Sequence, residues 1–345
     1  MASDAVVLTV PGPDGDREVR VSSPARILWP DLGITKLDLA NYLVAVGPAF
    51  IAANGDRPVS LQRFPDGVDG EQFFSKNPPR GAPEYVRAVD VTYPSKRVHP
   101  QLVLDEPAGV AWAAQMNTVV FHPWASRAEA PDLPDQLRID LDPQPGTTFA
   151  DAVTAALELR NVLNDVGLTA FVKTSGNRGL HVFAPIAAEH EFLDVRHAVI
   201  AAARELERRM PDHVTTAWWK EERGERIFVD FNQANRDRTM AGAYSPRALA
   251  RASVSMPVTW DELPGVDAAD FTILTAPDRL AATGDPWEGM HAGAGARASI
   301  GPLLEWWERD VSNGLGELPF PPDFPKMPGE PPRVQPSRAR APKAE

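Results

Sequence analysis

Two acidic residues alternate with apolar ones in the segment 138–143, which reads RIDLDP. This period of two predicts a half-buried β-strand with Asp140 and Asp142 on one face, about 6.6–6.8 Å apart along the strand. Paired carboxylates on a stiff strand are hard oxygen ligands for divalent metal, as a two-metal phosphoryl-transfer enzyme needs. The alternative is a solvated strand face or a cap for the helix that follows.

A third acid, Asp230, lies late in the apolar run 226–231, which reads RIFVDF. An isolated acid in such a strand costs free energy unless it is paired or metal-bound. The alternative is an edge-strand aspartate that faces water. Three acids of this kind on neighbouring strands favour a metal site over either alternative.

The segment 173–181, KTSGNRGLH, places two glycines, a serine and an arginine between two predicted strands. Glycines let backbone amides approach an anion closely, and Ser175 and Arg178 supply further donors to phosphate oxygens. His181 can donate to a phosphate or to a sugar hydroxyl. The alternative is a glycine-rich hairpin with a core histidine. The segment is not a Walker A loop, because the G-K-[ST] ending is missing.

Other candidates are weaker when they are taken alone. His122 closes an apolar strand, where a histidine is more often structural. Several arginines lie in 232–251, Arg247 among them, and the segment is either a solvated basic loop or a source of positive charge for a triphosphate. Phe73 and Phe74 are core aromatics by default, or alternatively a platform on which bases stack.

The elements that must position these residues follow the order β-α-β-β-α-β, typical of the ferredoxin-like split βαβ pattern of the α/β (α+β) class. After the Asp140 strand we expect a helix at about 149–165, strands at 170–174 and 180–184, a helix at about 194–210 and a strand at 227–231. Upstream we expect a hairpin at 5–22, a helix from the capping box 35–38 to about 53, strands at 58–64, 71–76 and 118–123, an exposed loop region at 77–100 and a loop at 124–136.

The 345 residues suffice for one large domain or two moderate ones, with 43% hydrophobic residues to form a core. We expect an N-terminal module at about 1–115, a catalytic module at about 116–300, and a Pro-rich extension at 301–345 that is disordered or draped on the surface from about 318. Cysteine is absent, which excludes disulfides, thiolate zinc sites and cysteine nucleophiles. We expect no signal peptide, no membrane span and a cytoplasmic, nucleoid-associated location.

The net charge of −12 argues against tight non-specific binding to nucleic acid, because affinity for phosphates comes mainly from lysine and arginine. The argument is limited, since a metal enzyme collects carboxylates at its site and a local basic groove can coexist with an acidic remainder. An enzyme that holds one DNA end remains compatible with this charge.

Taken together, Asp140-Leu141-Asp142, the segment 175–181 and Asp230 resemble the archaeo-eukaryotic primase superfamily in order and spacing. More closely they resemble the polymerase domain of bacterial ligase D, here in a stand-alone form, over about residues 20–300. The resemblance implies a primase-polymerase fold, in which a ferredoxin-like or RRM-like catalytic sheet packs against an N-terminal α/β module.

The resemblance also implies a set of site residues. Asp140, Asp142 and Asp230 would hold two divalent cations, with manganese favoured and magnesium as the alternative. The incoming nucleotide would contact Ser175, Arg178, His181 and Arg247, with His122 near its sugar.

Further implied contacts concern DNA. Arg26 and Lys36 stand where the family reads the 5′-phosphate of a gap, and Phe73 and Phe74 would stack on template bases. Gln62 stands where the family has a lysine that contacts nucleotide phosphates, a departure that weakens one such contact.

The function expected from this resemblance is template-dependent nucleotidyl transfer by a primase-type DNA/RNA polymerase. It would add ribo- or deoxynucleotides, with ribonucleotides preferred, at gaps and ends during double-strand break repair by non-homologous end joining. The expected partners are DNA with a 5′-phosphate, NTP or dNTP, a Ku-like protein and a ligase, and no membrane. Two alternatives stay open: a non-catalytic DNA-end bridging module that uses Arg26, Lys36 and 77–100, and a metal-dependent phosphohydrolase.

Overall fold

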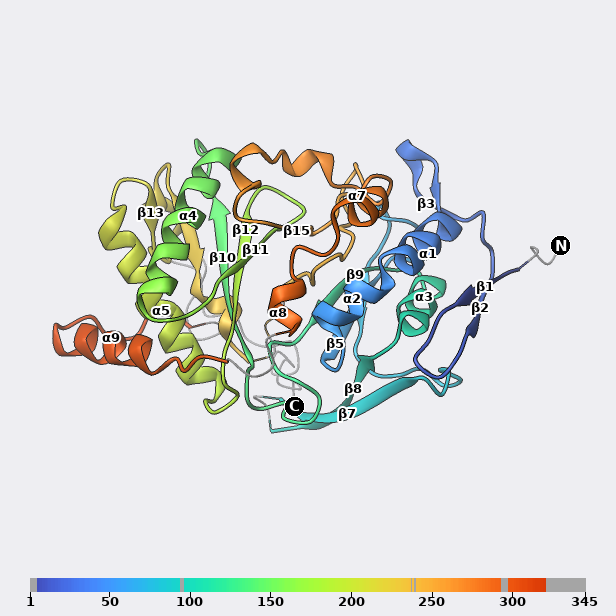
Figure 1. Ribbon diagram of the computed structural model, residues 1–345, viewed down its shortest axis with the longest axis horizontal. Helices are drawn as coiled ribbons and strands as arrows, with labels where there is room; N and C mark the ends of the chain where they lie inside the picture. The colour runs from blue at the N-terminus through green and yellow to red at the C-terminus, as the bar shows by residue number, and fades with distance from the viewer. Residues whose placement is uncertain (1–4, 94–95, 237, 239, 293–296, 321–345) are drawn as a thin grey trace, which may run out of the picture.

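The computed structural model describes residues 5–93, 96–236, 238, 240–292 and 297–320. It contains two sheet-based modules that lie side by side, the later one on the left of Figure 1 and the N-terminal one on the right. The candidate site residues come from both, so the packing of the modules matters for the site.

A six-stranded sheet forms the centre of the later module, in the order β13-β14-β10-β12-β11-β15. Its four inner neighbours β14, β10, β12 and β11 pair antiparallel, which is the order expected of a ferredoxin-like unit and confirms that prediction. The strands are β10 (Gln136–Pro143), β11 (Phe171–Thr174), β12 (Leu180–Pro185), β13 (Val214–Thr215), β14 (Ile227–Asp230) and β15 (Pro257–Val258).

Helices α4 (Phe149–Asp165) and α5 (Phe192–Arg209) pack against each other and against β10. In β10, Ile139 and Leu141 are fully buried, whereas the alternate residues Asp140 and Asp142 keep partial exposure. Alternation along one strand therefore gives the apolar residues to the core and the two acids to the other face of the sheet, as the period of two predicts.

The N-terminal module contains a five-stranded sheet in the order β6-β5-β8-β7, with β9 also pairing with β5. These strands are β5 (Pro58–Arg63), β6 (Phe73–Ser75), β7 (Val86–Thr92), β8 (Val98–Leu104) and β9 (Thr118–Pro123). Helices α1 (Lys36–Ala45), α2 (Gly47–Asn54) and α3 (Pro107–Gln115) pack together in this module, and the hairpins β1 (Val6–Val10)–β2 (Arg17–Val21) and β3 (Ile27–Trp29)–β4 (Ile34–Thr35) complete it.

Two sequence expectations for this module are wrong. The region 77–100 is not all loop, because it contains β7 and the start of β8, which pair in a regular antiparallel register. The single helix expected from residue 36 to about 53 is two helices bent by 70°, with the break at Val46. Pro48 explains the break, because it has no N–H to continue the hydrogen bonds of a preceding turn.

Shorter helices lie between or after these elements: α6 (Lys220–Arg223), α7 (Ala276–Thr283), α8 (Glu288–Ala292) and the 3-10 helices η1 (Pro30–Leu32), η2 (Phe231–Ala234), η3 (Leu263–Gly265) and η4 (Ala268–Asp270). Helix α9 (Gly301–Ser312) packs on α5, although the sequence division assigns its residues to the C-terminal extension. The Pro-rich part of that extension from 321 lies outside the described residues.

Among the described helices none alone is long and apolar enough to cross a membrane, and only the bent pair α1–α2 passes by length and composition.

Candidate active site

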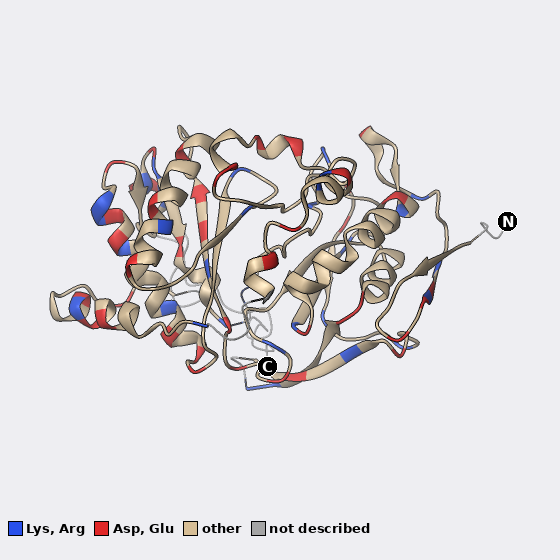
Figure 2. Cartoon of the chain, in the orientation of Figure 1, with Lys and Arg blue, Asp and Glu red and all other residues tan. Residues whose placement is uncertain are grey.

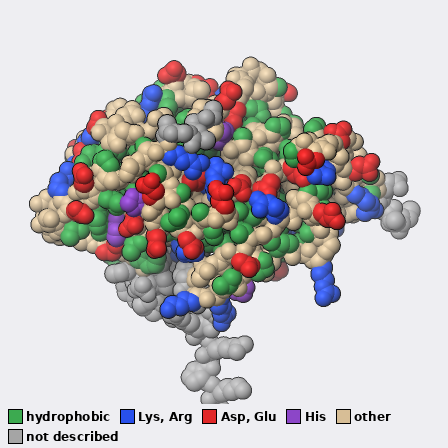
Figure 3. Space-filling view, turned by 60° about the horizontal axis from the view of Figure 1, so that its bottom comes forward, with side chains coloured by type: hydrophobic (Ala, Val, Ile, Leu, Met, Phe, Trp, Pro, Cys, Tyr) green, Lys and Arg blue, Asp and Glu red, His purple; other side chains and the backbone are tan. Residues whose placement is uncertain are grey.

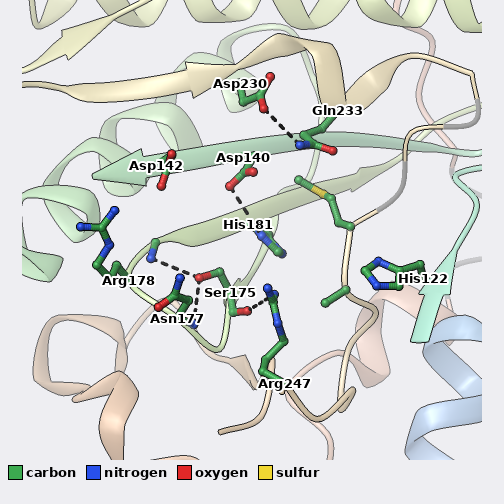
Figure 4. Close-up of a pocket in the computed structure, with 13 residues that line it drawn as sticks. His122, Asp140, Asp142, Ser175, Asn177, Arg178, His181, Asp230, Gln233 and Arg247 are labelled. Carbon is green, nitrogen blue, oxygen red and sulfur yellow. Dashed lines mark hydrogen bonds and ion pairs between the residues drawn. The ribbon is translucent and has the colours of Figure 1, made fainter. Parts of the chain in front are cut away.

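A polar cavity of about 280 Å³ lies between the acid-bearing face of the β10 sheet and strand β9 of the N-terminal module. Figure 4 shows how the side chains around it converge. All three predicted acids line this cavity: Asp140, Asp142 and Asp230. Five further predicted residues do so as well: His122, Ser175, Arg178, His181 and Arg247. The topology therefore gathers residues that are up to 125 positions apart in the chain, from His122 to Arg247.

The register of β10 against β14 brings two of the acids together. Asp140 is paired directly with Asp230, and Asp142 lies two positions further along the same face of β10. Burial and the charges of Asp230 and Asp142 raise the pKa of Asp140 well above its usual range. Burial likewise raises the pKa of Asp230. The charge of Asp140 is thus disfavoured by its two acidic neighbours, and a cation bound beside these acids would offset this cost.

The three carboxylates are suitable ligands for divalent cations, but their side chains do not form a complete metal site in this structure. No three acidic or histidine side chains within the described ranges converge on one point as they lie. The oxygens of Asp230 accept from the backbone N–H of Asn232 at 3.0 Å and from Gln233 Nε2 at 3.1 Å. Residues of η2 therefore hold the Asp230 carboxylate in position beside Asp140.

The loop between β11 and β12 is held by its own serine. Ser175 Oγ accepts from the backbone N–H groups of Asn177 at 3.2 Å and Gly179 at 3.1 Å, so these two amides are already used within the loop. Arg247 Nη1 donates to the Ser175 carbonyl at 2.7 Å, and Arg178 lines the same cavity as Asp142. Attraction for an anion at this cavity thus comes mainly from the two arginine side chains, because the Asn177 and Gly179 amides are already hydrogen-bonded.

Gly179 is required by packing. A Cβ at this position would lie 2.2 Å from the carbonyl oxygen of Leu141, a contact that real Cβ atoms do not make. The loop consequently lies directly against the strand that carries Asp140 and Asp142, which holds the loop backbone beside these acids.

His181 lies on β12 directly beside Asp140, its register partner on β10. His181 Nε2 is 3.5 Å from Asp140 Oδ1, and Nδ1 is 2.6 Å from Lys173 Nζ on β11. The sequence analysis gave Lys173 no role. The available signal was a lysine inside an apolar strand, where a charged group is costly unless every hydrogen finds a partner.

The other edge of the cavity is formed by strand β9 and the hairpin beside it. His122 Nε2 is 3.0 Å from Gln62 Oε1, and the rings of Phe74 and His122 are 5.6 Å apart. Gln62 lines an adjoining cavity of about 240 Å³ that also reaches Arg247. Phe73 and Phe74 are 44% and 54% exposed, which excludes the interpretation that they are core residues.

Arg26 and Lys36 lie away from this cavity, next to each other where β3 and β4 pair. Arg26 is exposed, and its guanidinium donates to the carbonyl of Pro65. Lys36 is only 4% exposed, and its Nζ donates to the carbonyls of Ser22 at 2.9 Å and Gln115 at 3.3 Å. The Lys36 side chain therefore stabilises the fold in this structure. It can contact a phosphate only if its hydrogen bonds to these two carbonyls break.

The charged residues are distributed over the whole chain, with acidic positions on the central strand β10 (Figure 2). On the face turned forward in Figure 3, Lys and Arg side chains alternate with Asp and Glu side chains. This mixture agrees with the net charge of −12 and confines strong attraction for phosphate to local clusters.

Comparisons with known proteins agree with this geometry. Residues 35–287 match the family model of the LigD primase-polymerase domain. The chain is 32% identical over 288 residues to the multifunctional non-homologous end joining protein LigD of Pseudomonas aeruginosa, covering 81% of this chain and 34% of that protein. The corresponding protein of Mycolicibacterium smegmatis is 31% identical over 314 residues, covering 89% of this chain and 40% of the relative.

The structural match is equally broad. The polymerase domain of Mycobacterium tuberculosis ligase D, solved in complex with DNA, superposes with a TM-score of 0.73 at 30% identity, covering 80% of this chain and 99% of that one. The chain thus spans well under half the length of these two curated relatives and nearly all of the solved polymerase domain. On the strength of the matched region, the order of the motifs and the shared fold, the chain belongs to the LigD primase-polymerase domain family.

Proposed function

We propose that this protein is a template-dependent nucleotidyltransferase that extends a 3′ end at gaps and ends of DNA during non-homologous end joining. The observation that carries the proposal is the cavity in which three carboxylates meet Arg178, Arg247 and His181. Family membership and the DNA-bound solved relative support the same reaction class.

Asp140, Asp142 and Asp230 are the residues that would hold two divalent cations, with manganese favoured. When bound, such ions lower the pKa of a primer 3′-hydroxyl and neutralise the charge of a triphosphate. The pair of Asp140 and Asp230 across two strands supports this assignment, because their mutual repulsion is relieved by a cation.

The chain's own groups bind and orient the substrates. Arg178 and Arg247 offer guanidinium groups to the triphosphate, and the 3′-oxygen forms a bond to the α-phosphorus as pyrophosphate leaves. Phe74, exposed beside His122, offers a ring on which a template base can stack. Catalysis of this kind rests on positioning and on charge neutralisation.

Substrate details follow from the family and from local groups. We expect ribonucleotides to be preferred over deoxynucleotides, and His122 to lie near the sugar of the incoming nucleotide. Arg26 would contact a 5′-phosphate with its exposed guanidinium, and Lys36 would join it once released from its carbonyl partners. A Ku-like protein and a ligase are the proposed partners, in the cytoplasm at the nucleoid.

The deciding experiment is primer extension on a gapped duplex with Mn²⁺ or Mg²⁺, ribo- or deoxynucleotides, and a 5′-phosphate or 5′-hydroxyl. We expect templated incorporation that is strongest with Mn²⁺, ribonucleotide and 5′-phosphate. Binding of the duplex without any incorporation would instead assign a DNA-end bridging role. Release of inorganic phosphate without extension would assign a phosphohydrolase.

A further inference from the structure

The chain continues past residue 287, where the match to the family model ends, and returns to the sheet that carries the acids. Helix α9 packs on α5 (Figure 1), and residues 315–320, here called the C-terminal strap, run back along α5. The strap first meets Arg204, whose guanidinium donates to two strap carbonyls, and then Arg196, about two turns earlier in the helix. Residues outside the family match are thereby brought to a helix that packs on the β10 sheet.

Arg196 is fully buried and binds the strap and the sheet at once. Its Nη2 donates to the carbonyls of Leu318 at 2.9 Å and Pro319 at 3.4 Å, and its Nη1 pairs with the Glu317 carboxylate. Its Nε and Nη2 also donate to Asn232 Oδ1, at 3.3 Å and 3.2 Å. A guanidinium keeps its charge when buried and presents its donors in a rigid planar fork, so Arg196 fixes Asn232 relative to the strap.

The orientation of the Asn232 amide follows from the nature of its partners. The Arg196 guanidinium can only donate, so the amide atom that faces it is Oδ1. The carbonyl of Pro319 can only accept, so the amide atom 3.2 Å from it is Nδ2. Exchange of the two amide atoms would set N–H groups against the guanidinium and a lone pair against a carbonyl, so one orientation is strongly preferred.

Asn232 belongs to the turn that carries the third acid. Its backbone N–H donates to Asp230 Oδ1 at 3.0 Å, and the next residue, Gln233, donates to Asp230 Oδ2 at 3.1 Å (Figure 4). The turn is η2, a 3-10 helix of four residues, and the hydrogen bonds within such a helix have poor geometry. The shape of η2 therefore depends on side-chain anchors, and Arg196 supplies one that is fully buried.

We propose that Arg196 is a positioning residue: held by the C-terminal strap, it orients Asn232 so that η2 keeps the Asp230 carboxylate facing Asp140. Arg196 has no exposed surface, so it acts through Asn232 and not on a substrate. The inference rests on the proposed function for its purpose, because Asp230 is one of the acids that would hold a cation there. It adds to the site a supporting segment that lies outside the family match at 35–287.

The direct test is hydrogen exchange at the Asn232 backbone amide, measured by NMR in the full chain without added metal. Arg196→Lys keeps a positive charge but loses the planar fork that joins Asn232 to the strap. We expect the Asn232 amide to exchange about tenfold faster in this variant than in wild type. Arg204→Lys is the matched control, because Arg204 is also a buried α5 arginine bonded to the strap, and its Asn232 amide should exchange within about twofold of wild type.

Binding of Mn²⁺, followed by the EPR signal of the free ion, tests the purpose of this anchor without turnover. We expect the dissociation constant to rise about tenfold in Arg196→Lys and in Asn232→Ala, and by about the same factor in the double variant, because the two residues act in series. In primer extension the Arg196→Lys variant should lose kcat at low Mn²⁺ and recover it at high Mn²⁺, with little change in the nucleotide KM. Multiplied effects in the double variant, or unchanged Mn²⁺ binding in Arg196→Lys, would overturn the proposal.

Equal exchange at Asn232 in Arg196→Lys and wild type, or equal acceleration in Arg204→Lys, would also overturn it. If Arg196→Lys does not fold by circular dichroism, Glu317→Ala replaces it, since this side chain is 47% exposed and its loss removes one partner of Arg196. About threefold faster exchange at Asn232 is then expected, and exchange equal to wild type would refute the positioning role. Faster exchange in Arg196→Lys combined with a wild type that binds no Mn²⁺ or adds no nucleotide would refute the proposed function alone, since exchange requires neither metal nor turnover.

Discussion

Asp135 joins the two modules through a buried charge cluster, and its replacement gives the sharpest prediction of stability. The side chain is 2% exposed and accepts from Arg57 Nη2 at 3.0 Å, Arg127 Nε at 2.8 Å and Arg297 Nη1 at 2.9 Å. Burial by itself would raise the pKa of Asp135, but the three arginines outweigh burial and hold the pKa at about 2, below the ordinary 3.8.

The sign of the pH effect follows from this lowered pKa. A carboxyl group that holds its proton less tightly when folded stabilises the protein above pH 3.8, and this stabilisation is lost as the pH falls through 2. The difference between 3.8 and about 2 corresponds to about 2 kcal/mol at neutral pH. Asp135→Asn also leaves Arg57 buried without its countercharge, so the total loss at pH 7 is expected to be about 3–5 kcal/mol.

Urea unfolding at a series of pH values from 6 to 2 measures both quantities. The free energy of unfolding of wild type should exceed that of Asp135→Asn at pH 6, and the gap should shrink by about 2 kcal/mol by pH 2. Asp132→Asn is the control, because Asp132 also pairs with an arginine but is 59% exposed, so less than about 1 kcal/mol is expected. A gap that stays constant across this range would refute the reasoning.

Three further predictions concern the site and its surroundings. Asp140→Asn should abolish extension yet raise Tm at pH 7 in chelator, because a carboxylate whose pKa is raised by burial and neighbouring acids destabilises the folded state at neutral pH; a lower Tm would contradict this. Ending the chain at Asn313 should cost about 3 kcal/mol in urea unfolding, because Arg196 loses three acceptors in 317–319, whereas ending it after Phe320 keeps them and should not. Phe74→Ala should weaken binding of a single-stranded template by about 1–3 kcal/mol in fluorescence anisotropy, and unchanged affinity would remove the stacking role.

Much of the fold could be predicted from short-range sequence patterns. The alternation in 138–143 predicted β10 and the side on which Asp140 and Asp142 lie, and the order of elements predicted the ferredoxin-like sheet. The capping box at 35–38 is present, with Asp38 Oδ2 accepting from the Thr35 backbone N–H at 2.8 Å. Such features depend on contacts within a few residues, so they can be derived without knowledge of the rest of the chain.

Predictions from local composition failed where the conformation of a segment depends on contacts with distant parts of the chain. The region 77–100 has many prolines and charges, yet β7 forms because its backbone pairs along its full length with β8. Lys36 has the side chain of an exposed helix residue, but carbonyls from Ser22 and Gln115, the latter 79 positions away, surround its ammonium. Strand propensity and burial of this kind are set by partners that periodicity does not reveal.

By itself the sequence determined the candidate residues for chemistry: three acids, a glycine-rich loop with Arg178, and a histidine on the following strand. Only the tertiary structure decided that Asp230 faces Asp140 across β14 and β10 and that Lys173 meets Nδ1 of His181. The physical reason is that residue type and spacing define what a side chain can bind, whereas strand register and burial define which group it meets and at what cost in charge.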